Sequence, residues 1–231
     1  MKSVITIRVI FIDFFIFNNK FYIEMIFNII YTCPNITKMP PLEYNVKDKI
    51  EYLYGKGLRA TEEGKQAIKD ADWSVEYLIK IFGEVLKVDI TPKNTPILYD
   101  LLITIYNKHQ FCHYQMSKIF FKERPYVYMK EDSAVKKDEE NLRKVSSYPS
   151  GQAQLGYIFG SILSKISPED ADKLYQRGLD YGEARVITGY HWQSDVELSR
   201  EIAKMFLQSL YQQEEFQKWL KVAKKEFDFK K

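Results

Sequence analysis

The stretch that decides the fold is S-Y-P-S-G-Q at residues 147–152, followed by G-E-A-R-V-I-T-G-Y-H-W-Q-S-D at residues 182–195. Pro149 and Ser150 predict a helix start, because proline has no N–H to lose in a first turn and serine is a good N-cap. Such a start leaves free backbone N–H groups at the positive end of the helix dipole. The first half of the stretch therefore predicts a site for an anion the size of phosphate.

The second half of the stretch carries side chains suited to chemistry. His191 and Asp195 are four residues apart, and on a helix this spacing predicts that the carboxylate holds the imidazole N–H. Arg185 precedes them, and a guanidinium matches phosphate oxygens in a bidentate manner. An anion-binding helix start, an arginine and an oriented histidine together indicate phosphoryl chemistry.

Three motifs in this order resemble those of the bacterial class A nonspecific acid phosphatases. That family belongs to the phosphatidic acid phosphatase type 2 superfamily, which also includes relatives of the vanadium haloperoxidases. Its pattern is K-x6-R-P, then P-S-G-H, then S-R-x5-H-x3-D. The matching residues here are Lys118…Arg124-Pro125, Pro149-Ser150-Gly151-Gln152 and Ala184-Arg185-x5-His191-x3-Asp195. The likeness extends from about residue 45 to the C-terminus, and an ordered three-part pattern is far more specific than a single motif.

The resemblance implies a metal-independent phosphomonoesterase that uses no cofactor and acts on small phosphomonoesters. It implies that His191 is the nucleophile and forms a phosphohistidine, and that Asp195 fixes its tautomer. The implied phosphate ligands are Lys118, Arg124, Ser150, Gly151 and Arg185. The resemblance also implies a periplasmic or secreted homodimer.

One departure from the family pattern bears on activity. Gln152 stands where the family has the histidine that protonates the leaving oxygen, and an amide cannot transfer a proton at neutral pH. A placed general acid typically contributes ~10²–10⁴-fold to the rate. We therefore expect a phosphatase with a weakened general-acid step. The alternative is a pseudoenzyme that binds phosphate or a phosphoester without turnover.

Two further departures concern phosphate binding. Ala184 replaces the serine before the third-motif arginine, which removes one hydroxyl. Only five residues separate Lys118 from Arg124, so the position of the family lysine is occupied by Ser117. Lys122 is the alternative to Lys118 as a phosphate ligand.

Composition is that of a globular protein that could fold as one domain. Of the 231 residues, 45% are hydrophobic and 28% charged, and the net charge is only +3. This small positive charge favours anionic ligands weakly and gives no argument for nucleic-acid binding. The region 39–231 lacks long apolar runs, which disfavours a membrane-spanning lipid phosphatase.

Residues 1–38 differ from the domain that follows, residues 39–231. Their two apolar runs, 4–17 and 21–31, contain charged residues and fall short of a membrane span. They resemble a signal peptide only loosely, since no small-x-small cleavage site follows. An export or anchor signal and a natural start near Met39 both stay open.

No strand pattern occurs, and the apolar spacing predicts an all-α helical bundle. The predicted helices cover residues 45–54, a segment from 61, 75–86, 98–121, 149–165, 168–181, 192–210 and 214–227. The polar segment 129–147 has no period and predicts a loop or flap near the site. Its Glu131, Asp132 and Glu139 are alternative proton donors.

The motif His109-x-x-Cys112-His113 has the spacing of zinc ligands on a helix. His191 is the only further histidine, and the resembled family uses no metal, so we favour helix packing and predict no metal site. A disulfide between Cys112 and Cys33 stays open.

Overall fold

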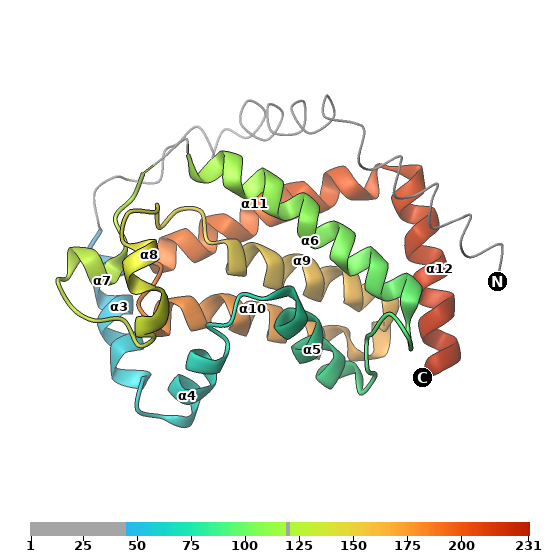
Figure 1. Ribbon diagram of the computed structural model, residues 1–231, viewed down its shortest axis with the longest axis horizontal. Coiled ribbons are helices and arrows are strands. Elements are labelled where there is room, and N and C mark those ends of the chain that lie inside the picture. Colours follow the sequence, from blue (N-terminus) through green and yellow to red (C-terminus); the bar gives the residue numbers. More distant parts are fainter. Residues whose placement is uncertain (1–44, 119–120) are drawn as a thin grey trace.

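The computed structural model describes residues 45–118 and 121–231 (Figure 1). The atypical segment 1–38, with its signal-like runs and Cys33, lies outside these residues. The described residues form helices and no strand, so the predicted all-α fold is confirmed.

The helices have the following bounds: α3 Val46–Leu58, α4 Glu62–Lys69, α5 Val75–Leu86, α6 Pro96–Ser117, α7 Pro125–Tyr128, α8 Glu139–Leu142, α9 Gly151–Ile166, α10 Ala171–Ile187, α11 Gln193–Tyr211 and α12 Glu214–Lys230. Short 3-10 turns occupy Lys136–Asp138 and Pro168–Asp170. Two predicted boundaries were wrong: α6 ends at Ser117 rather than near 121, and α10 runs past 181 to Ile187. The longer α10 places Arg185 in its last helical turn.

Side-chain caps fix where several of these helices begin. Four N-cap side chains each accept a hydrogen bond from the backbone N–H of the third helical residue: Asn45, Thr61, Ser74 and Ser150. These are the short polar residues that satisfy the free N–H groups of a first turn. The sequence therefore defines the starts of α3, α4, α5 and α9 locally.

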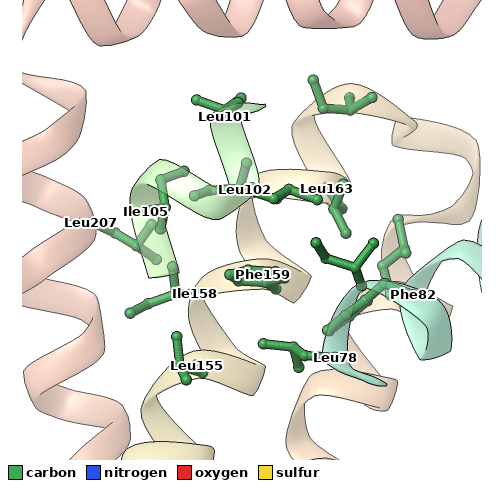
Figure 2. Packing of buried hydrophobic residues seen from close by; sticks show 14 of the residues in the cluster. Leu78, Phe82, Leu101, Leu102, Ile105, Leu155, Ile158, Phe159, Leu163 and Leu207 are labelled. Atoms are coloured by element: carbon green, nitrogen blue, oxygen red, sulfur yellow. The ribbon is translucent and has the colours of Figure 1, made fainter. Parts of the chain in front are cut away.

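Helix α9 lies at the centre of the bundle, with α10, α11 and α6 around it (Figure 1). The apolar core forms where these helices meet α5. Figure 2 shows Phe159 of α9 between Leu102 of α6 and Leu78 of α5, and all three side chains are almost completely buried. Burial of such side chains is the dominant stabilising contribution to a helical bundle.

Two glycines allow α9 and α10 to approach very closely. A Cβ built on Gly156 would lie 2.3 Å from the carbonyl oxygen of Gly178, and one on Gly178 would lie 2.2 Å from that of Gly156. Any larger side chain at either position would push the helices apart. This close approach sets α10 against the helix that begins at the P-S-G motif.

The bundle brings the ends of four helices together. Helices α9 and α11 begin, and α6 and α10 end, at the side of the molecule where α7 and α8 lie (Figure 1). None of the described helices is long and apolar enough to cross a membrane.

Candidate active site

The turn between α10 and α11 ties His191 to the end of α10. The backbone N–H groups of Tyr190 and His191 both donate to the carbonyl oxygen of Arg185, over 2.9 and 3.2 Å. Gly189 makes this turn possible because its φ is +83°, a left-handed conformation that favours glycine. A Cβ there would also meet Arg59 Nη2 at 2.4 Å. The third motif thus folds so that its arginine and histidine lie close together.

His191 is buried, and its two ring nitrogens have different surroundings. Nδ1 lies 2.5 Å from the carbonyl oxygen of Ser147, so Nδ1 carries the proton and donates. Nε2 therefore carries the lone pair and accepts a hydrogen bond from Nη1 of Arg124 at 3.3 Å. Burial, with the charges of Arg124 and Arg185, holds the pKa of His191 well below its usual value. The ring is therefore a neutral imidazole with Nε2 available as a nucleophile.

The predicted hydrogen bond between Asp195 and His191 is not formed, and this expectation was wrong. His191 precedes α11 rather than lying in it, so the helical spacing does not apply. Asp195 accepts instead from the N–H of Trp192 at 2.9 Å and from the hydroxyl of Ser147 at 2.5 Å. It therefore acts on His191 indirectly, by fixing the residue whose carbonyl holds the ring.

A buried lysine balances the charge of Asp195. Lys122 Nζ lies 2.9 Å from Asp195 Oδ1 and 3.6 Å from Asp48 Oδ2, and it also donates to Ser194 Oγ. Burial raises the pKa of Asp195, and the donors around it, Lys122 first, act against that shift. With these partners, Lys122 serves as a counter-ion within the protein.

Arg124 is buried, and its guanidinium lies next to His191. Its guanidinium donates to the carbonyl oxygens of Tyr190 and Ser146, both at 3.0 Å, and to those of Leu142 and Val145, both at 3.1 Å. Most of these acceptors lie in the polar segment 129–147, which wraps around the side chain. Burial and the charge of Arg185 lower the pKa of Arg124 to about 10, so it stays charged at neutral pH.

Arg185 is buried without an ionic partner among the described residues. Its guanidinium lies over the ring of Tyr190, 4.4 Å from the centroid, and its Nε has no hydrogen-bond partner. Burial lowers its pKa to about 10, so it too carries a charge at neutral pH. A buried charge is costly unless an anion or a set of acceptors compensates it. Two buried guanidiniums therefore lie beside His191, and neither is within ion-pair distance of a described carboxylate, a combination that favours an anionic ligand.

Helix α9 begins at Gly151, close to the helix start that the P-S-G motif predicts. Ser150 is the N-cap, with its Oγ accepting from the N–H of Ala153 at 3.4 Å. Gly151 is the first helical residue, and a Cβ there would meet the ring of His113 at 3.2 Å. Both residues lie at a helix N-terminus, where free backbone N–H groups favour an anion. The N–H of Ser150 is not free, because it donates to Ser199 Oγ over 2.7 Å.

Gln152 is buried, and its side chain is committed to a neighbouring segment. Its Nε2 donates to the carbonyl oxygen of Asp70 over 2.9 Å. Asp70 is itself held by Arg177 through two hydrogen bonds of 2.6 and 2.8 Å. Gln152 thus joins α9 to the end of α4.

The structure does not bring Lys118 into this group. The side chain is exposed, and its Nζ contacts the hydroxyl of Tyr114 on the preceding helical turn. Neither of the two lysines considered from sequence is placed as a free phosphate ligand, because Lys122 is bound to carboxylates.

Sequence reasoning missed Ser147, whose carbonyl orients His191. It also missed that His113 lies against Gly151 at the start of α9. No residue type signals a backbone acceptor, whereas the pair His109 and His113 was a visible signal that we assigned to packing. His109 and His113 both contact Gln154 Oε1, at 2.7 and 3.2 Å. No group of three or more histidine, cysteine, aspartate or glutamate side chains able to hold a metal occurs among residues 45–118 and 121–231.

Comparison with known proteins identifies the family. A non-specific acid phosphatase of Providencia stuartii is 37% identical over 183 residues, which is 79% of this chain and 74% of that protein. The chain belongs to the family of bacterial non-specific acid phosphatases. The enzyme of Salmonella typhimurium is 35% identical over the same shares of the two chains, and an acid phosphatase of Zymomonas mobilis is 25% identical over 87% of this chain. No protein-family profile matches the chain.

Membership of the acid phosphatase family confirms the resemblance found in the three motifs. It also gives a chemical context for the two buried guanidiniums of Arg124 and Arg185, since an acid phosphatase must hold a phosphoryl group. The roles of individual residues follow from the geometry and are proposed below.

Proposed function

We propose that this chain hydrolyses phosphomonoesters without a metal ion, through a phosphohistidine on His191 and with a weakened general-acid step. The observation that carries the proposal is the pair of buried guanidiniums beside an imidazole whose Nε2 is unprotonated. The family supports it, because the related proteins are named acid phosphatases.

The chemistry follows from the placement of these groups. Arg124 and Arg185 hold the phosphoryl oxygens and stabilise charge in the transition state. His191 Nε2 attacks phosphorus as the bond to the leaving oxygen breaks, while Ser147 retains the proton on Nδ1. Water then attacks the phosphohistidine, which releases phosphate and restores the imidazole.

The general-acid step is weakened because Gln152 cannot give up a proton. Its amide is also directed to the carbonyl oxygen of Asp70. This observation favours the second candidate function, a protein that binds phosphate esters without turning them over. Under that alternative the two arginines would bind vanadate or phosphate while no ester is cleaved.

One assay separates the two candidates. Wild type and His191→Ala are incubated with an aryl phosphate, whose leaving group departs without full protonation, and with vanadate as a ligand. The phosphatase proposal expects hydrolysis by wild type and none by His191→Ala, with vanadate inhibiting the former. Vanadate binding without hydrolysis by wild type would establish the binding protein instead.

The family precedent also supports an exported homodimer. We propose a periplasmic or secreted location, which cell fractionation tests, and a dimer, which light scattering of the purified chain tests. A cytoplasmic monomer would contradict both.

A further inference from the structure

A second histidine lies against the start of α9. His113, on the penultimate turn of α6, is partly exposed. A Cβ placed on Gly151 would meet its Cε1 and Nε2 atoms, each at 3.2 Å. The Nε2 edge of the ring therefore lies against the first residue of the P-S-G helix, one position before Gln152.

Gln154 orients this ring. Its Oε1 lies 3.2 Å from His113 Nδ1 and 2.7 Å from His109 Nε2. An amide oxygen only accepts hydrogen bonds, so both of these ring nitrogens carry protons. His113 is thereby held with Nε2, its second ring nitrogen, at the edge that faces Gly151.

Charged and titratable groups reach His113 from three elements. His109, on the same helix, stacks on the ring of His113 with 5.6 Å between ring centroids. Arg124, which precedes α7, and His191, which precedes α11, interact with His113 electrostatically. Burial and then Arg124 lower the pKa of His113 to about 4, while the hydrogen bond that His113 donates to Gln154 acts in the opposite direction. The charge of His113 in turn lowers the pKa of His191, so the two rings share one electrostatic environment. A bound phosphate anion adds negative charge there and raises the pKa of His113 again.

The other candidate proton donors are engaged elsewhere. Glu131 accepts from Tyr52 and Lys56, at 2.9 and 2.8 Å. Asp132 pairs with Lys136, and Glu139 accepts from the N–H of Ser133. Position 152 holds an amide bound to Asp70.

We infer that His113 is a catalytic residue that donates the proton from Nε2 to the leaving oxygen, an inference that rests on the proposed phosphatase function. As the bond from His191 Nε2 to phosphorus forms, the bond from phosphorus to the ester oxygen breaks. The proton on His113 Nε2 passes to that oxygen, and the alcohol leaves.

The second half of the reaction returns the proton. Neutral His113 takes a proton from water as the water oxygen attacks phosphorus, and the bond between phosphorus and His191 breaks. Phosphate leaves, and both histidines return to their starting states. The acid step is weakened relative to a histidine at position 152, since the low pKa leaves little protonated His113 at neutral pH.

The test compares leaving groups. Wild type, His113→Gln and the matched control His109→Gln are assayed as full chains with an alkyl phosphate and an activated aryl phosphate. In assays at a pH near the pKa of His113, we expect His113→Gln to lose ~10²-fold or more in kcat/KM on the alkyl ester, the usual contribution of a protonated general acid, and to change little on the aryl ester. His109→Gln removes the other histidine of the pair and should affect both esters alike. Equal effects of His113→Gln on the two esters would overturn the inference.

Rescue and pH give independent readouts. The double variant His113→Gln with Gln152→His should regain activity on the alkyl ester. In wild type, the ratio of alkyl to aryl rates should fall as pH rises through the pKa of His113, and a flat ratio would overturn the inference even if the variants fail to fold. If folded wild type hydrolyses no aryl phosphate, the proposed phosphatase function itself is refuted. That outcome differs from the equal effects on the two esters that would refute only the role of His113.

Discussion

The imidazole of His191 is held by the backbone of Ser147, with 2.5 Å between Nδ1 and the carbonyl oxygen. The hydroxyl of Ser147 donates to Asp195, and Asp195 pairs with Lys122. The orientation of the His191 ring therefore depends on a chain of contacts in which the carboxylate of Asp195 acts through Ser147. A backbone acceptor also leaves the ring neutral, since it brings no negative charge to the imidazole.

The Lys122 ion pairs should matter more for stability than any exposed pair. Lys122→Met would leave Asp195 and Asp48 buried without their cation, which is expected to cost about 3–5 kcal/mol of unfolding free energy. The matched control is Lys118→Met, because Lys118 is exposed and its replacement should stay within about 0.5 kcal/mol. Urea denaturation of both variants checks this. Similar midpoints for the two would show that Lys122 does not neutralise a buried site.

The contact between Gly156 and Gly178 should tolerate no added atom. Gly156→Ala places a methyl group 2.3 Å from the carbonyl oxygen of Gly178, and the resulting overpacking is expected to cost about 1–3 kcal/mol. Gly57→Ala is the matched control, since a Cβ there meets nothing within 4 Å and lies in the helix α3. Alanine at Gly57 should stabilise by about 0.4–1 kcal/mol. Thermal melts in which Gly156→Ala has a higher melting temperature than Gly57→Ala would contradict the close packing of α9 against α10.

The sequence predicted the architecture well because its signals are local. Caps such as Ser74 and Ser150 and the apolar stripe of 75–86 act within a helix, and the structure forms these helices where expected. The predicted helix 168–181 ended just before Gly182, whereas α10 continues through this glycine to Ile187. Gly182 allows a close approach to α9, because a Cβ there would lie 3.1 Å from the Cα of Ala153. Contacts between helices decided this boundary.

The candidate site was predictable only in part. The motifs named Arg124, Arg185 and His191, which the structure places together, because each carries a recognisable side chain. The predicted contact between Asp195 and His191 was wrong because the spacing argument assumed that both residues lie on one helix, whereas α11 begins at Gln193, two residues after His191. Ser147 contributes a backbone carbonyl, which no residue pattern reveals.

Acid should destabilise the fold because His109 and His191 are buried as neutral rings. Burial lowers the pKa of His109 to about 3, so below about pH 6.5 the unfolded state binds a proton that the folded state does not. The unfolding free energy therefore falls as pH falls. His109→Gln removes one such group. Its unfolding free energy should therefore fall by about 1.5 kcal/mol less than that of wild type when the pH is lowered from 6.5 to 5. Denaturant titrations at the two pH values measure this, and parallel losses would show that His109 does not titrate on unfolding.

Restoring histidine at position 152 should change the dependence on the leaving group. Gln152→His is expected to raise the rate on alkyl phosphates ~10²-fold or more at neutral pH, where little His113 is protonated. Activated aryl phosphates should gain far less, since their leaving groups need little protonation. The measurement is kcat/KM for a series of esters with leaving groups of increasing pKa. An equal gain across the series would mean that residue 152 affects binding rather than proton transfer.

The most direct test of the central claim is to trap the phosphorylated enzyme. Wild type is mixed with an aryl phosphate, quenched in alkali, digested and examined by mass spectrometry, with His191→Ala as the control. The account predicts a phosphoryl group on the peptide that contains His191, stable in alkali and lost in acid, and none in His191→Ala. Turnover by wild type with no label, or with label on a peptide that lacks His191, would contradict it.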